Sequence, residues 1–209
     1  MKKLIVLASL LVAITVGAQS KYETAMNTAL EQMKGAKTVE EMTKAAAYFE
    51  RIAGAEKNQW LPFYYASLAN YYVGWMDEKA DKDVIAEKSK DLLIKAQQID
   101  MNNSELFCLE QMIATMQLVK DPMTRWQSYG KVAASALENA KKADPNNPRI
   151  YFLQAQSLMN TPEAFGGGKK VAKPIFEKSV ELYKSFKPAS SLHPNWGQEE
   201  AVKQLEACK

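Results

Sequence analysis

One short stretch of the chain combines the residue types of a phosphate site. It reads TPEAFGGGKK from Thr161 to Lys170, with three glycines before two lysines. A Walker loop needs a glycine, four residues and then Gly-Lys-Ser/Thr after a strand, but Glu163 stands at the first glycine position and Lys170 at the hydroxyl position. We therefore expect a tight connector between two helices, in which glycines supply backbone freedom and Phe165 fills the gap between the helices.

Residues that could act in catalysis are scarce. His193 is the single histidine and lies in the string SSLHPNWG, next to Ser191. Acid–base or nucleophilic catalysis needs a reactive group and an orienting partner, and no His, Cys or acidic residues have the spacing of a triad or a zinc site. We therefore expect a packing or surface role for His193, no metal or cofactor, and no enzymatic activity.

The cysteine content argues against a disulfide framework. Cys108 and Cys208 are the only cysteines, whereas exported proteins held by disulfides carry more. Cys108 lies in an apolar helical stretch, which favours a buried thiol that packs as a small apolar side chain. A Cys108–Cys208 bridge remains the alternative, because the sequence does not fix the geometry that a bridge needs.

The first twenty residues, MKKLIVLASLLVAITVGAQS, have the pattern of a signal peptide. Two lysines precede an uncharged apolar run, and small residues precede a cleavage point after Ala18. The sequence predicts a signal peptide over 1–18, a single mature domain over 19–209, and a periplasmic or secreted location; a retained N-terminal anchor is the alternative.

Loss of Lys2 and Lys3 lowers the net charge from +3 to about +1, and a near-neutral surface argues against nucleic acid as a partner.

An internal repeat organises the mature chain. Three segments align without gaps and start at Tyr48, Leu92 and Ala136, each 44 residues after the one before. A fixed period of this length is typical of a helical solenoid. Apolar residues recur at three- and four-residue spacing around Asn-rich turns, and no stretch alternates as a strand does. We predict an all-α chain of nine helices near 20–34, 38–55, 60–75, 82–99, 104–119, 122–143, 148–160, 169–186 and 196–207.

The repeats resemble the tetratricopeptide repeat (TPR) family. The strings LIKAQQIDMNNSE and LENAKKADPNNPR look like the end of one TPR and the start of the next. The small residue that the family has near the end of its second helix matches Ala96 and Ala140. The turn proline of the family matches Pro145, and Met101 takes its place one unit earlier. The period departs from the TPR length of about 34 residues, so longer helical repeats such as HEAT remain the structural alternative. The aromatic residue that opens the first helix of a repeat matches Phe63, Phe107 and Tyr151.

This resemblance implies a right-handed superhelical solenoid of antiparallel helix pairs, about four pairs with a C-terminal capping helix. In TPR proteins the first helix of each pair lines a concave face, and aromatic and Met side chains there suit adaptable recognition. Packing in the core is the alternative role for an aromatic stripe. The resemblance places these residues on the concave face: Tyr64, Leu68, Tyr71, Met112, Phe152 and Gln156.

The sequence therefore predicts a non-catalytic scaffold that binds a protein or peptide in the bacterial envelope. The alternative is a periplasmic TPR-like protein that binds a small molecule or serves transport. An enclosed apolar cavity would favour a small ligand, and an open shallow groove would favour a peptide.

Overall fold

The computed structural model describes residues 21–208, and every regular element among them is a helix. The expected signal peptide and its cleavage after Ala18 lie outside the described residues. Within them, no helix is long and apolar enough to cross a bilayer. After a first helix at 21–35, the chain forms α2 (Val39–Ala55), α3 (Trp60–Met76), α4 (Lys82–Ile99), α5 (Ser104–Leu118), α6 (Pro122–Arg125), a π-helical turn (Trp126–Gly130), α7 (Lys131–Ala143), α8 (Pro148–Met159), a 3-10 turn (Glu163–Phe165), α9 (Lys169–Ser185) and α10 (Gln198–Ala207).

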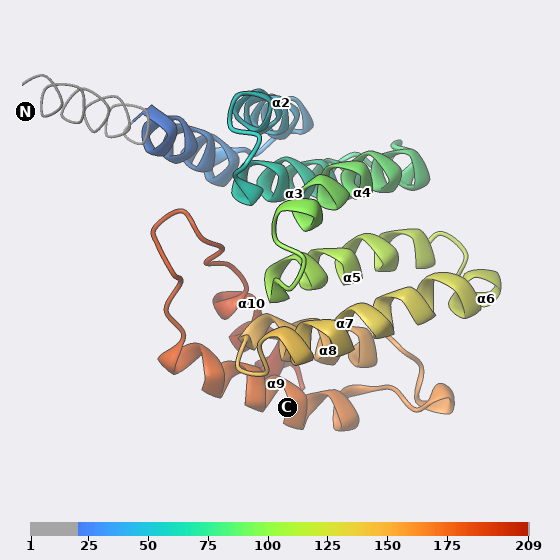
Figure 1. Cartoon of the computed structure of the whole chain (residues 1–209). Coiled ribbons are helices and arrows are strands. Elements are labelled where there is room, and N and C mark those ends of the chain that lie inside the picture. The colour runs from blue at the N-terminus through green and yellow to red at the C-terminus, as the bar shows by residue number, and fades with distance from the viewer. Residues whose placement is uncertain (1–20, 209) are drawn as a thin grey trace, which may run out of the picture.

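The helices pack as antiparallel pairs that stack side by side (Figure 1). The first helix lies beside α2, α3 packs against α4, α5 against α7, and α8 against α9, while α10 packs against α9. The all-α prediction of about four pairs and a final helix is confirmed. One expected helix, 122–143, is interrupted by the π-helical turn that ends at Gly130.

The repeat is visible in how the helices begin. Asn103 caps α5 and Asn147 caps α8, and each side chain accepts a hydrogen bond from the backbone two residues later. These residues are 44 positions apart, so the repeat period places equivalent caps at equivalent helices. A side-chain acceptor at this position stabilises the first turn, because the first backbone N–H groups have no partner within the helix.

The core runs through the middle of the stack. Phe49 of α2 is fully buried and stacks on Tyr65 of α3, with ring centres 5.2 Å apart. Buried residues occur all round α3 and α5, unlike the single buried stripe of a surface helix. Both helices are therefore covered on two sides, by their paired helices and by other parts of the chain.

The glycine-rich stretch is the connector between α8 and α9. Gly166 and Gly168 have φ of 82° and 100°, a region that glycine adopts at little cost. A Cβ at Gly167 would lie 2.1 Å from the carbonyl oxygen of Thr161. The expectation that Phe165 fills the gap is wrong, because its side chain is 72% exposed. The connector is closed by backbone bonds instead, from Gly167 N to Pro162 O and from Gly168 N to Leu158 O.

Both cysteines are free thiols. Cys108 is fully buried in α5, which confirms its expected packing role. Its burial raises the pKa of the thiol well above the usual value, so it stays protonated at neutral pH.

Candidate functional site

The face formed by α3, α5 and α8, here called the inner face, changes in exposure from one end to the other. The three helices run in the same direction, and α5 contacts both of the others (Figure 1). Along α3, Tyr64 and Leu68 are buried, Tyr71 is half-buried and Trp75 is 43% exposed. The same gradient recurs along α5 through Cys108, Met112, Thr115 and Val119, and along α8 through Phe152, Gln156 and Met159.

The inner face therefore has a covered half, near the helix starts, and an open half, near the helix ends. The open half carries aromatic rings with a cation beside them. The Tyr71 ring lies 5.6 Å from the Tyr72 ring and 6.1 Å from the Trp75 ring, and Lys82 Nζ lies 5.3 Å from the Trp75 ring centre. The residues of the open half are Tyr71, Trp75, Thr115, Val119, Gln156 and Met159.

These side chains suit a flat apolar ligand. Aromatic faces bind planar rings by stacking, and an ammonium group at the edge can pair with an acidic substituent. Burial raises the pKa of the Tyr71 hydroxyl, so this group is a neutral phenol at physiological pH.

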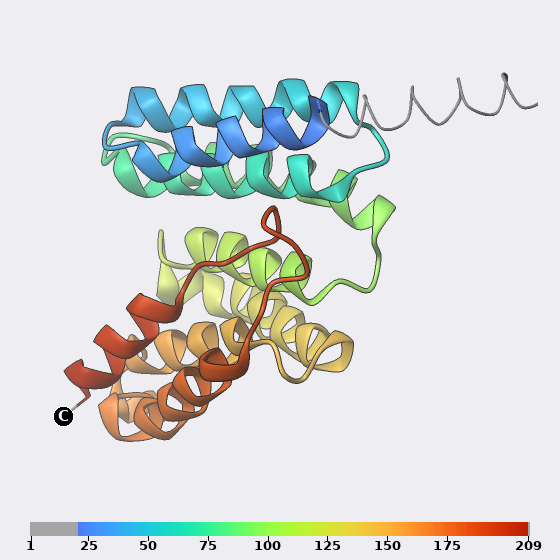
Figure 2. The same ribbon diagram turned by 90° about the vertical axis from the view of Figure 1, so that its left-hand side faces the viewer.

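The covered half is occupied by another part of the chain. The connector from α9 to α10, residues 186–197, crosses it (Figure 2). We call residues 192–197 the strap. Trp196 Nε1 donates a hydrogen bond of 2.8 Å to the Tyr64 hydroxyl, and the Trp196 ring lies 6.5 Å from that of Phe152. Two residues of the expected concave face, Tyr64 and Phe152, are thus buried against the strap.

Three helices hold the backbone of the strap. The Tyr65 hydroxyl from α3, the Arg149 guanidinium from α8 and the Tyr183 hydroxyl from α9 each donate to a strap carbonyl oxygen. The distances are 2.9, 2.7 and 2.9 Å, to the carbonyl oxygens of Leu192, Pro194 and Trp196 respectively.

Arg149 is the centre of a buried polar cluster. Its side chain is fully buried, and its Nη1 lies 3.0 Å from Glu105 Oε1. The guanidinium carbon also lies over the rings of Phe186 and Trp196, at 4.8 and 5.1 Å from their centres. Burial raises the pKa of the Glu105 carboxyl, and Arg149 together with a hydrogen bond from Asn147 opposes this rise. The cluster binds α5, α8 and the strap to one another.

His193 lies on the strap and packs against Trp60. Its Nδ1 is 2.8 Å from Ser190 Oγ, and its ring meets that of Trp60 edge to face at 5.6 Å. Partial burial lowers the pKa of the imidazole, so it is mainly neutral at physiological pH.

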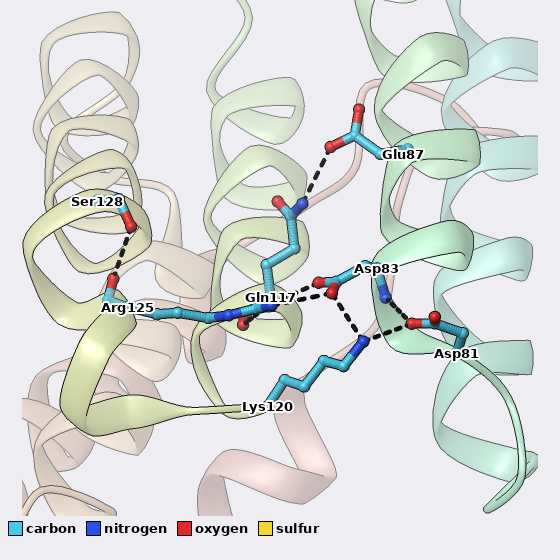
Figure 3. A network of polar contacts seen from close by, with 7 residues as sticks. All are labelled: Asp81, Asp83, Glu87, Gln117, Lys120, Arg125 and Ser128. Carbon is cyan, nitrogen blue, oxygen red and sulfur yellow. Dashed lines mark hydrogen bonds and ion pairs between the residues drawn. The ribbon is translucent and has the colours of Figure 1, made fainter.

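A polar network fixes the other end of the helices, beside the open half. Arg125 donates to both carboxylate oxygens of Asp83, at 2.6 and 3.0 Å, and to the backbone carbonyl of Gln117 (Figure 3). Lys120 lies 2.8 Å from Asp83 and 2.7 Å from Asp81. Hydrogen bonds from Arg125 and Lys120 lower the pKa of Asp83 to about 2. The network joins the start of α4, which carries Lys82, to α5 and α6.

Comparison with known proteins shows the family. No family model and no curated protein matches the chain. Among solved structures, the HusA haemophore from Porphyromonas gingivalis matches with a TM-score of 0.81 and 36% sequence identity. The alignment covers 90% of this chain and 92% of the haemophore. The chain belongs to the HusA haemophore family. Membership in the TPR family stays a prediction, although the helical repeat itself is confirmed.

In this member of the HusA family, the six residues expected on the concave face fall into two groups. Tyr71 and Gln156 belong to the open half, and their role in binding stays a prediction. The other four, Tyr64, Leu68, Met112 and Phe152, are buried.

The strap was not expected from the sequence, in which residues 192–197 are only a loop before the last helix. One signal was present: the apolar residues Leu192, Pro194 and Trp196 alternate with the more polar Ser191, His193 and Asn195.

Proposed function

We propose that this chain is an exported, non-catalytic carrier that binds haem or a related tetrapyrrole. The observation that carries the proposal is the 36% identity to a haemophore over 90% of this chain. Export rests on the signal pattern of residues 1–18, which would deliver the mature chain to the periplasm or the medium. This function refines the small-molecule alternative from the sequence; the protein-scaffold interpretation stays a prediction.

The open half of the inner face is the proposed site. A tetrapyrrole is a broad flat ring that is apolar on both faces and carries carboxylates at one edge. Trp75 and Tyr71 offer rings for stacking, and the side chains of Val119 and Met159 extend the apolar surface across α5 and α8. Lys82, beside the Trp75 ring, offers a charge partner for a carboxylate.

Absorbance titration tests the proposal. Purified protein of residues 19–209 is titrated with haem while the Soret band is followed, and the difference spectrum should saturate at a fixed stoichiometry. A site made by ring stacking shields the chromophore from water, so the band should also sharpen relative to free haem. A linear, non-saturating change would contradict the proposal, since it would report only non-specific association.

A further inference from the structure

Lys82 is a cation without an anionic partner at the edge of the open half. It is the first residue of α4 and is half-buried, and its Nζ lies 5.3 Å from the centre of the Trp75 ring. Among residues 21–208 its ammonium group makes no ion pair and no hydrogen bond. Both of its neighbours along the chain, Asp81 and Asp83, are acidic. Two uncompensated carboxylates so close to Lys82 would repel an anionic ligand.

Both aspartates are instead compensated by cations from the segment that follows α5. Lys120 Nζ lies 2.7 Å from Asp81 and 2.8 Å from Asp83, and Arg125 donates to both carboxylate oxygens of Asp83 (Figure 3). These hydrogen bonds lower the pKa of both carboxyl groups, that of Asp83 to about 2, so both are ionised at neutral pH. Two acids and two bases cancel, so the charge that remains beside the Trp75 ring is that of Lys82.

The same bonds fix the backbone that carries Lys82. The Asp81 carboxylate also accepts a hydrogen bond of 3.0 Å from the backbone N–H of Asp83, which caps α4. One ammonium group, that of Lys120, therefore holds the residues on both sides of Lys82. Adjacent side chains of a helix do not face each other, so the contacts of Asp83 leave the Lys82 side chain free to lie on Trp75.

We propose that Lys82 selects tetrapyrroles that carry a free carboxylate, and that Lys120 and Arg125 are positioning residues that keep its charge available. This inference rests on the proposed tetrapyrrole function and deepens it. An ammonium group binds a carboxylate by a charge-assisted hydrogen bond, whereas an ester carries no charge to bind. Without Lys120, the Asp81 carboxylate would be unpaired beside Lys82 and would offset the positive charge that the ligand needs.

The experiment compares haem with its dimethyl ester, in which both carboxyl groups are blocked. Chains of residues 19–209 are titrated with each compound, and the ratio of the two dissociation constants is the readout. The unaltered chain should prefer the free acid by about 5-fold, the upper end for an ion pair in contact with water. Lys82→Met should bring the ratio to about one, because the charge is lost. Lys79→Met is the control, since it removes an exposed lysine of the α3–α4 connector, and it should keep the preference.

Two further variants test the positioning role. Lys120→Met should lower the ratio to about 2-fold or less, because the Asp81 carboxylate then opposes Lys82. Addition of Asp81→Asn to this variant should restore the preference, since Asn removes the charge and still caps the helix, and Arg125 still holds Asp83. A general loosening of the site would weaken both compounds equally and leave the ratio unchanged. Because ratios are compared between variants, the different solubilities of the two compounds cancel.

The salt dependence of binding gives a measurement that needs no variant. When sodium chloride is raised from about 50 to about 500 mM, the affinity of the unaltered chain for the free acid should fall, because salt screens a partly exposed ion pair. The affinity for the ester should fall much less. An equal response of the two compounds to salt would contradict the proposal.

The outcomes separate this proposal from the function on which it rests. If both compounds saturate the unaltered chain with equal dissociation constants, carboxylate selection is refuted and the tetrapyrrole site stands. If neither compound saturates the chain, the proposed function fails and this inference fails with it. If Lys82→Met abolishes the preference but a natively folded Lys120→Met variant keeps it, as judged by circular dichroism, the positioning role is refuted.

Discussion

At the scale of single residues, one tryptophan of the inner face and one tryptophan of the strap have different surroundings. Trp196 is held by its indole N–H, which donates a hydrogen bond to the Tyr64 hydroxyl, and by the Arg149 guanidinium over its ring. Trp75 is 43% exposed, and only part of its ring surface is in contact with Tyr71 and Lys82. An exposed aromatic ring beside other partly exposed apolar residues is available to a ligand, whereas a ring that is already bonded is not.

Trp75→Ala should therefore weaken tetrapyrrole binding by about 1–3 kcal/mol, the range for loss of an aromatic anchor. The melting temperature should change little, since much of the ring is in solvent. Soret titrations and thermal melts measure the two effects. Met101→Ala is the control, because Met101 is 80% exposed in the α4–α5 turn, away from the open half. Equal affinities for both variants would place the ligand elsewhere.

Gly167→Ala should destabilise the fold by about 1–3 kcal/mol, the usual cost of overpacking, because the new Cβ would collide with the carbonyl oxygen of Thr161. Lys169→Ala and Lys170→Ala should stay within about 0.5 kcal/mol of the unaltered chain, because both side chains are exposed. Urea unfolding of the three variants makes the comparison. If the chain binds a nucleotide and the binding depends on these lysines, the connector is a phosphate site.

At the scale of elements, the helices are joined by different forces at their two ends. Near the starts of α5 and α8 the joint is buried and centres on Arg149 and Glu105. Near the start of α4 it is a partly exposed ionic network around Asp83, in which the Arg125 contact is bidentate. Solvent screens the second joint, so each of its pairs contributes little alone, and the network should respond to pH and salt.

Asp83→Asn should cause a small loss of stability at neutral pH and a clear change in its acid dependence. The pKa of Asp83 is about 2 in the folded chain, below the ordinary value of 3.8. Its contribution is therefore fully present above pH 3.8 and is lost as the pH falls through about 2. As the pH falls between these values, the free energy of unfolding should decrease less for the variant than for the unaltered chain. Urea unfolding at a series of pH values measures this. Identical slopes would show that the network does not hold Asp83 ionised.

At the scale of the whole molecule, the strap closes the helix stack on itself. It contacts α3, α8 and α9 at once and links parts of the chain that the repeat keeps apart. The end of a solenoid needs a cover for its last apolar face, and here α10 packs on α9 while the strap crosses the inner face (Figure 2).

Arg149→Ala should destabilise the chain by about 3–5 kcal/mol, because it leaves the Glu105 carboxylate buried without its partner. The double variant with Arg149→Met and Glu105→Leu should lose much less, since it removes both charges and keeps apolar volume. Urea unfolding gives both values. If the double variant is as unstable as Arg149→Ala, the loss comes from the released strap rather than from the unpaired carboxylate.

The sequence by itself determined the helices and their repeat. The 44-residue period, the turn chemistry around Pro145 and the caps at Asn103 and Asn147 are local signals, and each acts within a few residues of the position it marks. For this reason the expected helices agree with the observed ones to within a few residues, except where the π-helical turn interrupts the helix expected at 122–143.

The tertiary structure alone decided which half of the inner face is open. The resemblance to a helical-repeat family placed Tyr64 and Tyr71 on one face, but the strap covers the first and leaves the second half-buried. The bonds responsible join residues 127 and 132 positions apart, Tyr65 to Leu192 and Tyr64 to Trp196. Periodicity and turn propensity report only on neighbours along the chain, so no local pattern encodes a contact over that separation.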